Sequence, residues 1–195
     1  LLSDGLLVAE FEPRPLGALA VEELIRDLVP GPTTSWPDLP GLLAERSGGN
    51  PLHVIQALRL LVEGGCEVEA PVTDLILTRV GRLPTDALRI LQVASCLGRQ
   101  APLDVVRALC GGAGSFAEAL RLLIRRGLVE PDIERAVSVS HPRIAECVRE
   151  SIPADARRAL HEEIFLRGQA DGLPPCLLAL HAEEARLGEA ALTAL

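Results

Sequence analysis

Residues 115 to 152 read SFAEALRLLIRRGLVEPDIERAVSVSHPRIAECVRESI, and the spacing of their apolar side chains changes twice. Up to Gly127 the apolar residues recur with the helical period of about 3.6, and the glycine is placed to end that helix. GLVEP and AVSVS, on either side of DIER, then alternate with a period of two, which predicts a β-hairpin. HPRIAECVRESI restarts a helical pattern. We therefore expect a helix, a hairpin and a second helix in this order.

Short helical patterns precede and follow this stretch. Those before it are VTDLILTRVGRL (72–83), PTDALRILQVASCLG (84–98, with Pro84 in the first turn) and APLDVVRALCG (101–111). Helices followed by a hairpin and one more helix predict a winged-helix module over residues 71–152. ADARRALHEEIFLRG (154–168) and the Ala/Leu-rich residues 175–195 also read as helices. Residues 153–195 thus predict a linker helix and the start of a helical, TPR-like repeat region.

The first third of the chain predicts one strand and three helices. LLVAEF (6–11) is typical of a buried strand, and VEELIRDLV (21–29) and LPGLLAERSGG (39–49) are typical of helices separated by a proline-rich loop. GGNPLHVIQALRLLVEGG (48–65) predicts a helix that begins at Pro51, presents Ile55, Leu58, Leu61 and Val62 on one face, and stops at Gly64-Gly65. We expect a mainly α fold.

The composition excludes several kinds of chemistry. All 19 basic residues are arginine, so the chain contains no lysine for a phosphate-binding loop, a protein kinase or a Schiff base. No Ser/His/Asp or Cys/His arrangement stands out. Five cysteines without C-x-x-C spacing, and no apolar run of about 18 residues, favour a cytoplasmic protein with no membrane-spanning segment. We expect no catalysis and no metal site in this chain alone.

The net charge of −8 argues against nucleic acid as a partner, because phosphate binding needs concentrated positive charge. Arg121, Arg125 and Arg126 form the one locally basic patch. Such a patch is most often a solvated helix face. The alternative is that it contacts DNA from a winged helix.

Gly49-Asn50-Pro51 permits two compatible interpretations. Asn50 can cap the first-turn N–H groups of the helix, and Pro51 removes an N–H that would have no partner there. The glycines, which lack Cβ, would also let a ligand approach closely. His141 likewise stands between a predicted strand and a helix that begins at Pro142. Its imidazole can cap that helix or donate to a phosphate oxygen near the helix N-terminus.

His53, His161 and His181 lie within predicted helices among apolar neighbours, without a second ligand at metal-binding spacing. We interpret them as packed or half-exposed histidines.

Several phrases, in this order, resemble successive segments of STAND-type signal-transduction P-loop ATPases, found in large LuxR-like regulators, kinase- and cyclase-linked AAA-type ATPases and NOD-like receptors. FEPRPLGALAVEELIRDLV resembles the last core strand and first lid helix, and GGNPLHVIQALRLLVEGG the G-x-P segment. RVGRLPTDALRILQVASCLG is similar to the start of the winged helix. VSVSHPRIAECVRESIPADARRALHEEI is similar to the wing, the sensor histidine and the following helix.

The resemblance implies an arrangement of domains. Residues 1–15 would end an upstream ATPase core, 16–70 would form the helical lid, 71–152 the winged helix, and 153–195 the linker helix and first repeats. The phosphate loop and the Mg²⁺-binding acid would lie upstream, and further repeats downstream, in a longer parent chain. The parent would be a slow ATPase or a regulator of a linked kinase, cyclase or transcription output.

The resemblance also implies nucleotide contacts. Gly49, Asn50 and Pro51 would lie near the adenine of ADP or ATP, and His141 would contact the β-phosphate of ADP and hold a closed resting state. Pro142 departs from the family, where many members have Asp. Two alternatives remain open: a DNA-binding winged-helix regulator, and a helical scaffold that binds a protein partner or self-assembles without nucleotide.

Overall fold

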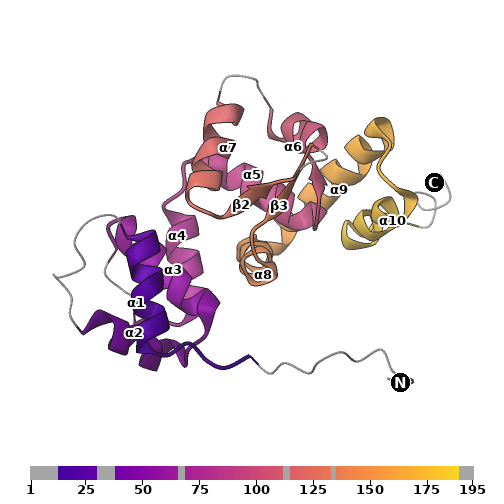
Figure 1. The fold of residues 1–195 in the computed structure, drawn as a ribbon. Coiled ribbons are helices and arrows are strands. Elements are labelled where there is room, and N and C mark those ends of the chain that lie inside the picture. Colours follow the sequence, from indigo (N-terminus) through magenta and orange to yellow (C-terminus); the bar gives the residue numbers. More distant parts are fainter. Residues whose placement is uncertain (1–12, 30–37, 66–68, 112–114, 133–134, 189–195) are drawn as a thin grey trace, which may run out of the picture. The chain divides into compact units, whose positions relative to one another are not determined.

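The computed structural model describes residues 13–29, 38–65, 69–111, 115–132 and 135–188. Over these residues it contains ten α-helices and one three-stranded antiparallel sheet (Figure 1). The predicted mainly helical class is therefore confirmed. The strand predicted at residues 6–11 lies outside the described residues. The chain divides into two compact units, Leu1–Leu75 and Ile76–Leu195, and the division falls within α4 (Val72–Gly81).

The first unit is built from three helices that all contact one another: α1 (Ala18–Leu28), α2 (Leu39–Ser47) and α3 (Pro51–Val62). Their apolar faces meet in one core, where burial of side chains such as Val21 and Leu43 supplies the main stabilisation. The face predicted for α3 was partly wrong. The helix buries Val54 and Leu58, whereas Val62 is half exposed. Because α3 is apolar around most of its circumference, its periodicity does not single out one face.

Helix α5 (Thr85–Leu97) forms the centre of the second unit. Eight of its 13 residues are buried, because α6 (Leu103–Cys110), α7 (Phe116–Arg125) and α8 (Pro142–Ser151) each pack against it. Pro84 is the N-cap of α5 rather than a first-turn residue as predicted.

Three short strands form the sheet of this unit in the order β1-β3-β2. The predicted hairpin is confirmed: β2 (Val129–Pro131) pairs antiparallel with β3 (Ala136–Val139), with Val129 opposite Val139. Sequence analysis missed β1 (Ala101–Pro102), which pairs with β3. Two residues are too few for a period, and alanine and proline have low strand propensity, so only the pairing with β3 makes them a strand.

The two last described helices, α9 (Ala154–Asp171) and α10 (Pro175–Glu184), lie side by side (Figure 1). Gly168 permits this packing, because a Cβ there would lie 2.5 Å from Leu173 Cδ1. The helix predicted over 175–195 is shorter than expected. It ends where Arg186 adopts a left-handed φ of 55° and the Leu187 N–H donates to the Ala182 carbonyl at 2.9 Å. Residues 189–195 lie outside the described residues.

Candidate nucleotide-binding residues and a pocket in the second unit

The start of α3 has the predicted cap. Asn50 Oδ1 accepts hydrogen bonds from the backbone N–H groups of Leu52 at 3.0 Å and His53 at 3.4 Å. Pro51 occupies the first helical turn, where a missing N–H costs nothing. The ring of Pro51 is exposed, so it remains free to contact a ligand.

The close approach expected at Gly49 is made by the chain itself. Gly49 has a φ of 70°, and a Cβ there would lie 2.5 Å from Pro15 Cβ and 2.6 Å from the Leu16 nitrogen. The Leu16 N–H donates to the Gly49 carbonyl at 2.9 Å. Gly49 therefore anchors the segment that enters α1, and its lack of a side chain is explained without a ligand.

His141 caps α8 in a way that fixes its protonation pattern. Its Nδ1 accepts a hydrogen bond from the Arg143 N–H at 3.0 Å. A neutral imidazole has one acceptor and one donor, so the proton of the neutral ring belongs on Nε2. The side chain is exposed at the helix N-terminus. The same ring can therefore cap α8 through Nδ1 and donate a hydrogen bond to an anion through Nε2.

The four predicted nucleotide-binding residues belong to different units. Gly49, Asn50 and Pro51 are in the first unit, and His141 is in the second. Each group has a structural role of its own: Asn50 caps α3, and His141 caps α8.

The arginine patch is only partly exposed. Arg121 and Arg125 face solvent on α7, whereas Arg126 is half-buried and donates to the Arg82 carbonyl at 3.3 Å. The Arg126 carbonyl in turn accepts from the fully buried Arg79 guanidinium at 2.6 Å. Arg126 therefore contributes to packing between α4 and α7 at the C-terminal end of α7.

His161 and His181, interpreted separately from the sequence, form a buried pair. Their Nδ1 atoms lie 2.9 Å apart, so one ring donates and the other accepts. Burial, and then the charge of His161, lowers the pKa of His181 to about 4, and burial also lowers that of His161. The pair joins α9 to α10. Their separation of 20 residues carries no helical periodicity, so sequence reasoning had no signal for it. His53, in the first unit, bonds the Ala70 carbonyl at 3.0 Å.

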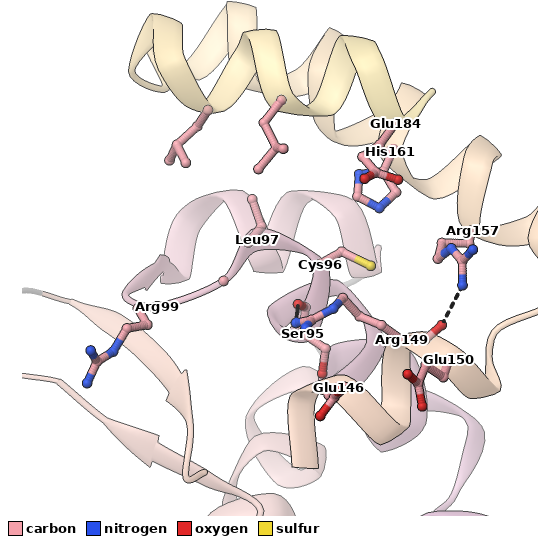
Figure 2. Close-up of a pocket in the computed structure, with 13 residues that line it drawn as sticks. Ser95, Cys96, Leu97, Arg99, Glu146, Arg149, Glu150, Arg157, His161 and Glu184 are labelled. Carbon is pink, nitrogen blue, oxygen red and sulfur yellow. Dashed lines mark hydrogen bonds between the residues drawn. The ribbon is translucent and has the colours of Figure 1, made fainter. Parts of the chain in front are cut away.

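Next to this pair the second unit contains a pocket of about 720 Å³ (Figure 2). Four helices line it. The end of α5 contributes Ser95, Cys96 and Leu97; α8 contributes Arg149; α9 contributes Arg157 and His161; and α10 contributes Glu184. Sequence reasoning missed the pocket, because these residues are far apart in the chain and form no motif.

The two arginines of the pocket are held by backbone carbonyls. Arg149 donates to the Ser95 carbonyl at 2.9 Å, and Arg157 donates to the Arg149 carbonyl at 3.2 Å, the dashed line beside Arg157 in Figure 2. Both side chains are half-buried. A guanidinium has five N–H donors, so each arginine keeps donors for a ligand.

The pocket is not arranged for nucleophilic catalysis. Burial raises the pKa of the Cys96 thiol to about 11 despite the nearby arginines, so the thiol remains protonated at neutral pH. Within the described part of the chain no group of three or more His, Cys, Asp or Glu side chains could hold a metal ion. None of the described helices is long and apolar enough to span a membrane.

No protein-family profile matches this sequence. A search of curated proteins finds no significant match either.

Proposed function

We propose that this chain is the regulatory portion of a STAND-type signalling ATPase, in which lid helices and a winged helix hold a nucleotide-dependent closed state in the cytoplasm. On this proposal the upstream core of the parent chain supplies the phosphate loop and binds Mg²⁺. The chain itself supplies contacts that distinguish ADP from ATP.

The element order of the second unit supports the winged-helix assignment. Helix α5 is followed by strand β1, helices α6 and α7, the β2–β3 hairpin and helix α8. The wing would be the β2–β3 hairpin, and β1 would complete its sheet beside β3. This is the arrangement of helices, hairpin and helix that the sequence resemblance implies.

The observation that carries the nucleotide proposal is the geometry of His141. Because its Nδ1 is committed to the Arg143 N–H, the exposed ring keeps Nε2–H as its donor. The N-terminus of α8 adds a positive partial charge next to it. A β-phosphate would therefore meet a donor whose orientation the cap has already fixed.

The start of α3 supports a narrower adenine contact than the sequence suggested. Gly49 is occupied by the close approach of Leu16, and Asn50 Oδ1 is occupied by the cap. The exposed ring of Pro51 is the flat apolar surface that remains for a base. We assign the adenine contact to Pro51.

The mechanism would be a population shift. ADP bound to both the core and His141 favours the closed state, and ATP releases it. A ligand that moves a 1:99 ratio to 99:1 must bind one state more tightly by about 5.5 kcal/mol. One charge-assisted hydrogen bond from His141 contributes about 1.5–3 kcal/mol of that difference.

The experiment uses the parent protein and His141→Asn. Asparagine keeps a cap oxygen in the place of Nδ1 but removes the Nε2 donor. We expect the output activity at rest, in ADP, to rise at least about fivefold, which is the lower range of allosteric coupling. Resting activity equal to the wild type, with α8 intact, would contradict the proposal. A parent reading frame without G-x-x-x-x-G-K-[ST] would contradict it as well.

A further inference from the structure

We propose that the pocket of the second unit binds a short peptide with apolar side chains and a free carboxylate. This inference is independent of nucleotide gating, because none of the proposed nucleotide contacts lines the pocket. A volume of about 720 Å³ suits a ligand of a few residues.

The cationic side of the pocket is prepared for a carboxylate. Arg149 and Arg157 are each tied down by one N–H, to the carbonyls of Ser95 and Arg149. A planar guanidinium that is already oriented loses little entropy when its remaining donors bind a carboxylate.

Apolar side chains also line the pocket. They are Leu97 at the end of α5, labelled in Figure 2, and Leu177 and Leu180 on α10. Leu180 is 47% exposed, so part of its side chain is available for contact with a ligand. Apolar side chains of the ligand would cover it.

The pocket is lined by equal numbers of positive and negative side chains, which favours a zwitterionic ligand over a simple anion. Three arginines line it, and so do three glutamates: Glu146, Glu150 and Glu184. Glu146 already pairs with Arg143, whereas Glu150 and Glu184 are exposed. A ligand with both a carboxylate and an ammonium group preserves this balance, and Glu150 or Glu184 would receive the ammonium.

Titration calorimetry of the 195-residue chain with trileucine, its N-acetyl form and its C-terminal amide tests the proposal. We expect trileucine to bind with a Kd below about 1 mM and the amide to bind at least about tenfold more weakly, because it lacks the carboxylate for Arg149 and Arg157. The acetylated peptide should be weakened less. No binding of trileucine, or equal binding of the amide, would overturn the proposal.

Two pairs of variants keep the test independent of folding. Leu180→Ala should weaken trileucine at least about fivefold, while Leu166→Ala, at a 59% exposed leucine on α9 outside the pocket, should not. Arg157→Gln should weaken trileucine at least about fivefold, because it removes a guanidinium that would bind the carboxylate. Arg167→Gln on the solvent face of α9 is its matched control. Equal effects of the two leucine variants would refute the site.

Discussion

The two units bury different kinds of side chain. The core of the first unit is apolar, and Gln56 is its one polar side chain among the fully buried residues described. The second unit buries a guanidinium, a hydroxyl and two imidazoles, those of Arg79, Ser95, His161 and His181.

The polar groups of the two units therefore have different roles. In the first unit the residues predicted to bind nucleotide make structural contacts: the Gly49 carbonyl accepts from the Leu16 N–H, and Asn50 caps α3. In the second unit His161 and His181 can each take up a proton, and Arg149 and Arg157 keep N–H donors for a ligand. We therefore expect the stability of the first unit to depend on close backbone contacts such as that at Gly49, and the stability of the second unit to depend on pH as well.

Gly49→Ala should give the largest effect, confined to the first unit. The new Cβ would meet the backbone nitrogen of Leu16 at 2.6 Å, and alanine would be strained at a φ of 70°. We expect a loss of about 4 kcal/mol in the free energy of unfolding of this unit, from strain and overpacking together. Chemical denaturation measures it.

Gly48→Ala is the matched control for that substitution. Gly48 also has a positive φ, of 57°, but a Cβ there meets nothing within 4 Å. We expect a loss of about 1 kcal/mol, the cost of the backbone conformation alone. Equal losses for the two variants would refute the close approach of Leu16.

Acid should destabilise the second unit more than the first. The folded-state pKa of His181, about 4, is below the ordinary value of 6.5, so the unfolded state binds more protons between these pH values. The stabilisation is fully present above about pH 6.5 and is lost as the pH falls towards 4. Between pH 7 and pH 5 we expect a loss of about 2 kcal/mol, measured by denaturation at each pH.

His181→Asn isolates this effect. An asparagine amide can still donate to His161 Nδ1, but it does not titrate in this range. The variant should reduce the loss of stability between pH 7 and pH 5, whatever its stability at pH 7. A pH dependence as steep as in the wild type would show that the pair is not its source. The charged side chains that act on His161 are those of Glu184, Arg157 and Arg149.

Apart from the Gly48→Ala control, Asn50→Ala should have the smallest effect. It removes the cap oxygen from the Leu52 and His53 N–H groups, which costs about 1 kcal/mol. Asn50→Asp supplies an equivalent oxygen and should restore stability. If both variants have the melting temperature of the wild type, the cap contributes no measurable stability. Asn50 would then not be a structural residue of the first unit.

Much of the fold was accessible from the sequence because it depends on local patterns. The switch of period at Gly127 predicted the hairpin, and the Asn50-Pro51 pair predicted the start of α3. The strand β1 and the end of α10 were not predictable, since one depends on pairing with β3 and the other on a non-glycine residue, Arg186, in a left-handed conformation.

The candidate sites divide in the same way. The Asn50 cap and the position of His141 before a helix could be predicted from adjacent residues. The pocket and the His161–His181 pair could not, because they depend on how α5, α8, α9 and α10 pack. Contacts between residues far apart in the chain leave no periodic signal in a single sequence.

The most direct test of the account is the affinity of the parent protein for ADP, measured by calorimetry for the wild type, His141→Asn and His141→Gln. Asparagine keeps the cap and removes the distal donor, whereas the longer glutamine can extend an amide N–H towards the place of Nε2. We predict at least about tenfold weaker ADP binding for His141→Asn and partial recovery for His141→Gln. Unchanged affinity in both variants would contradict the account and reduce His141 to a helix cap.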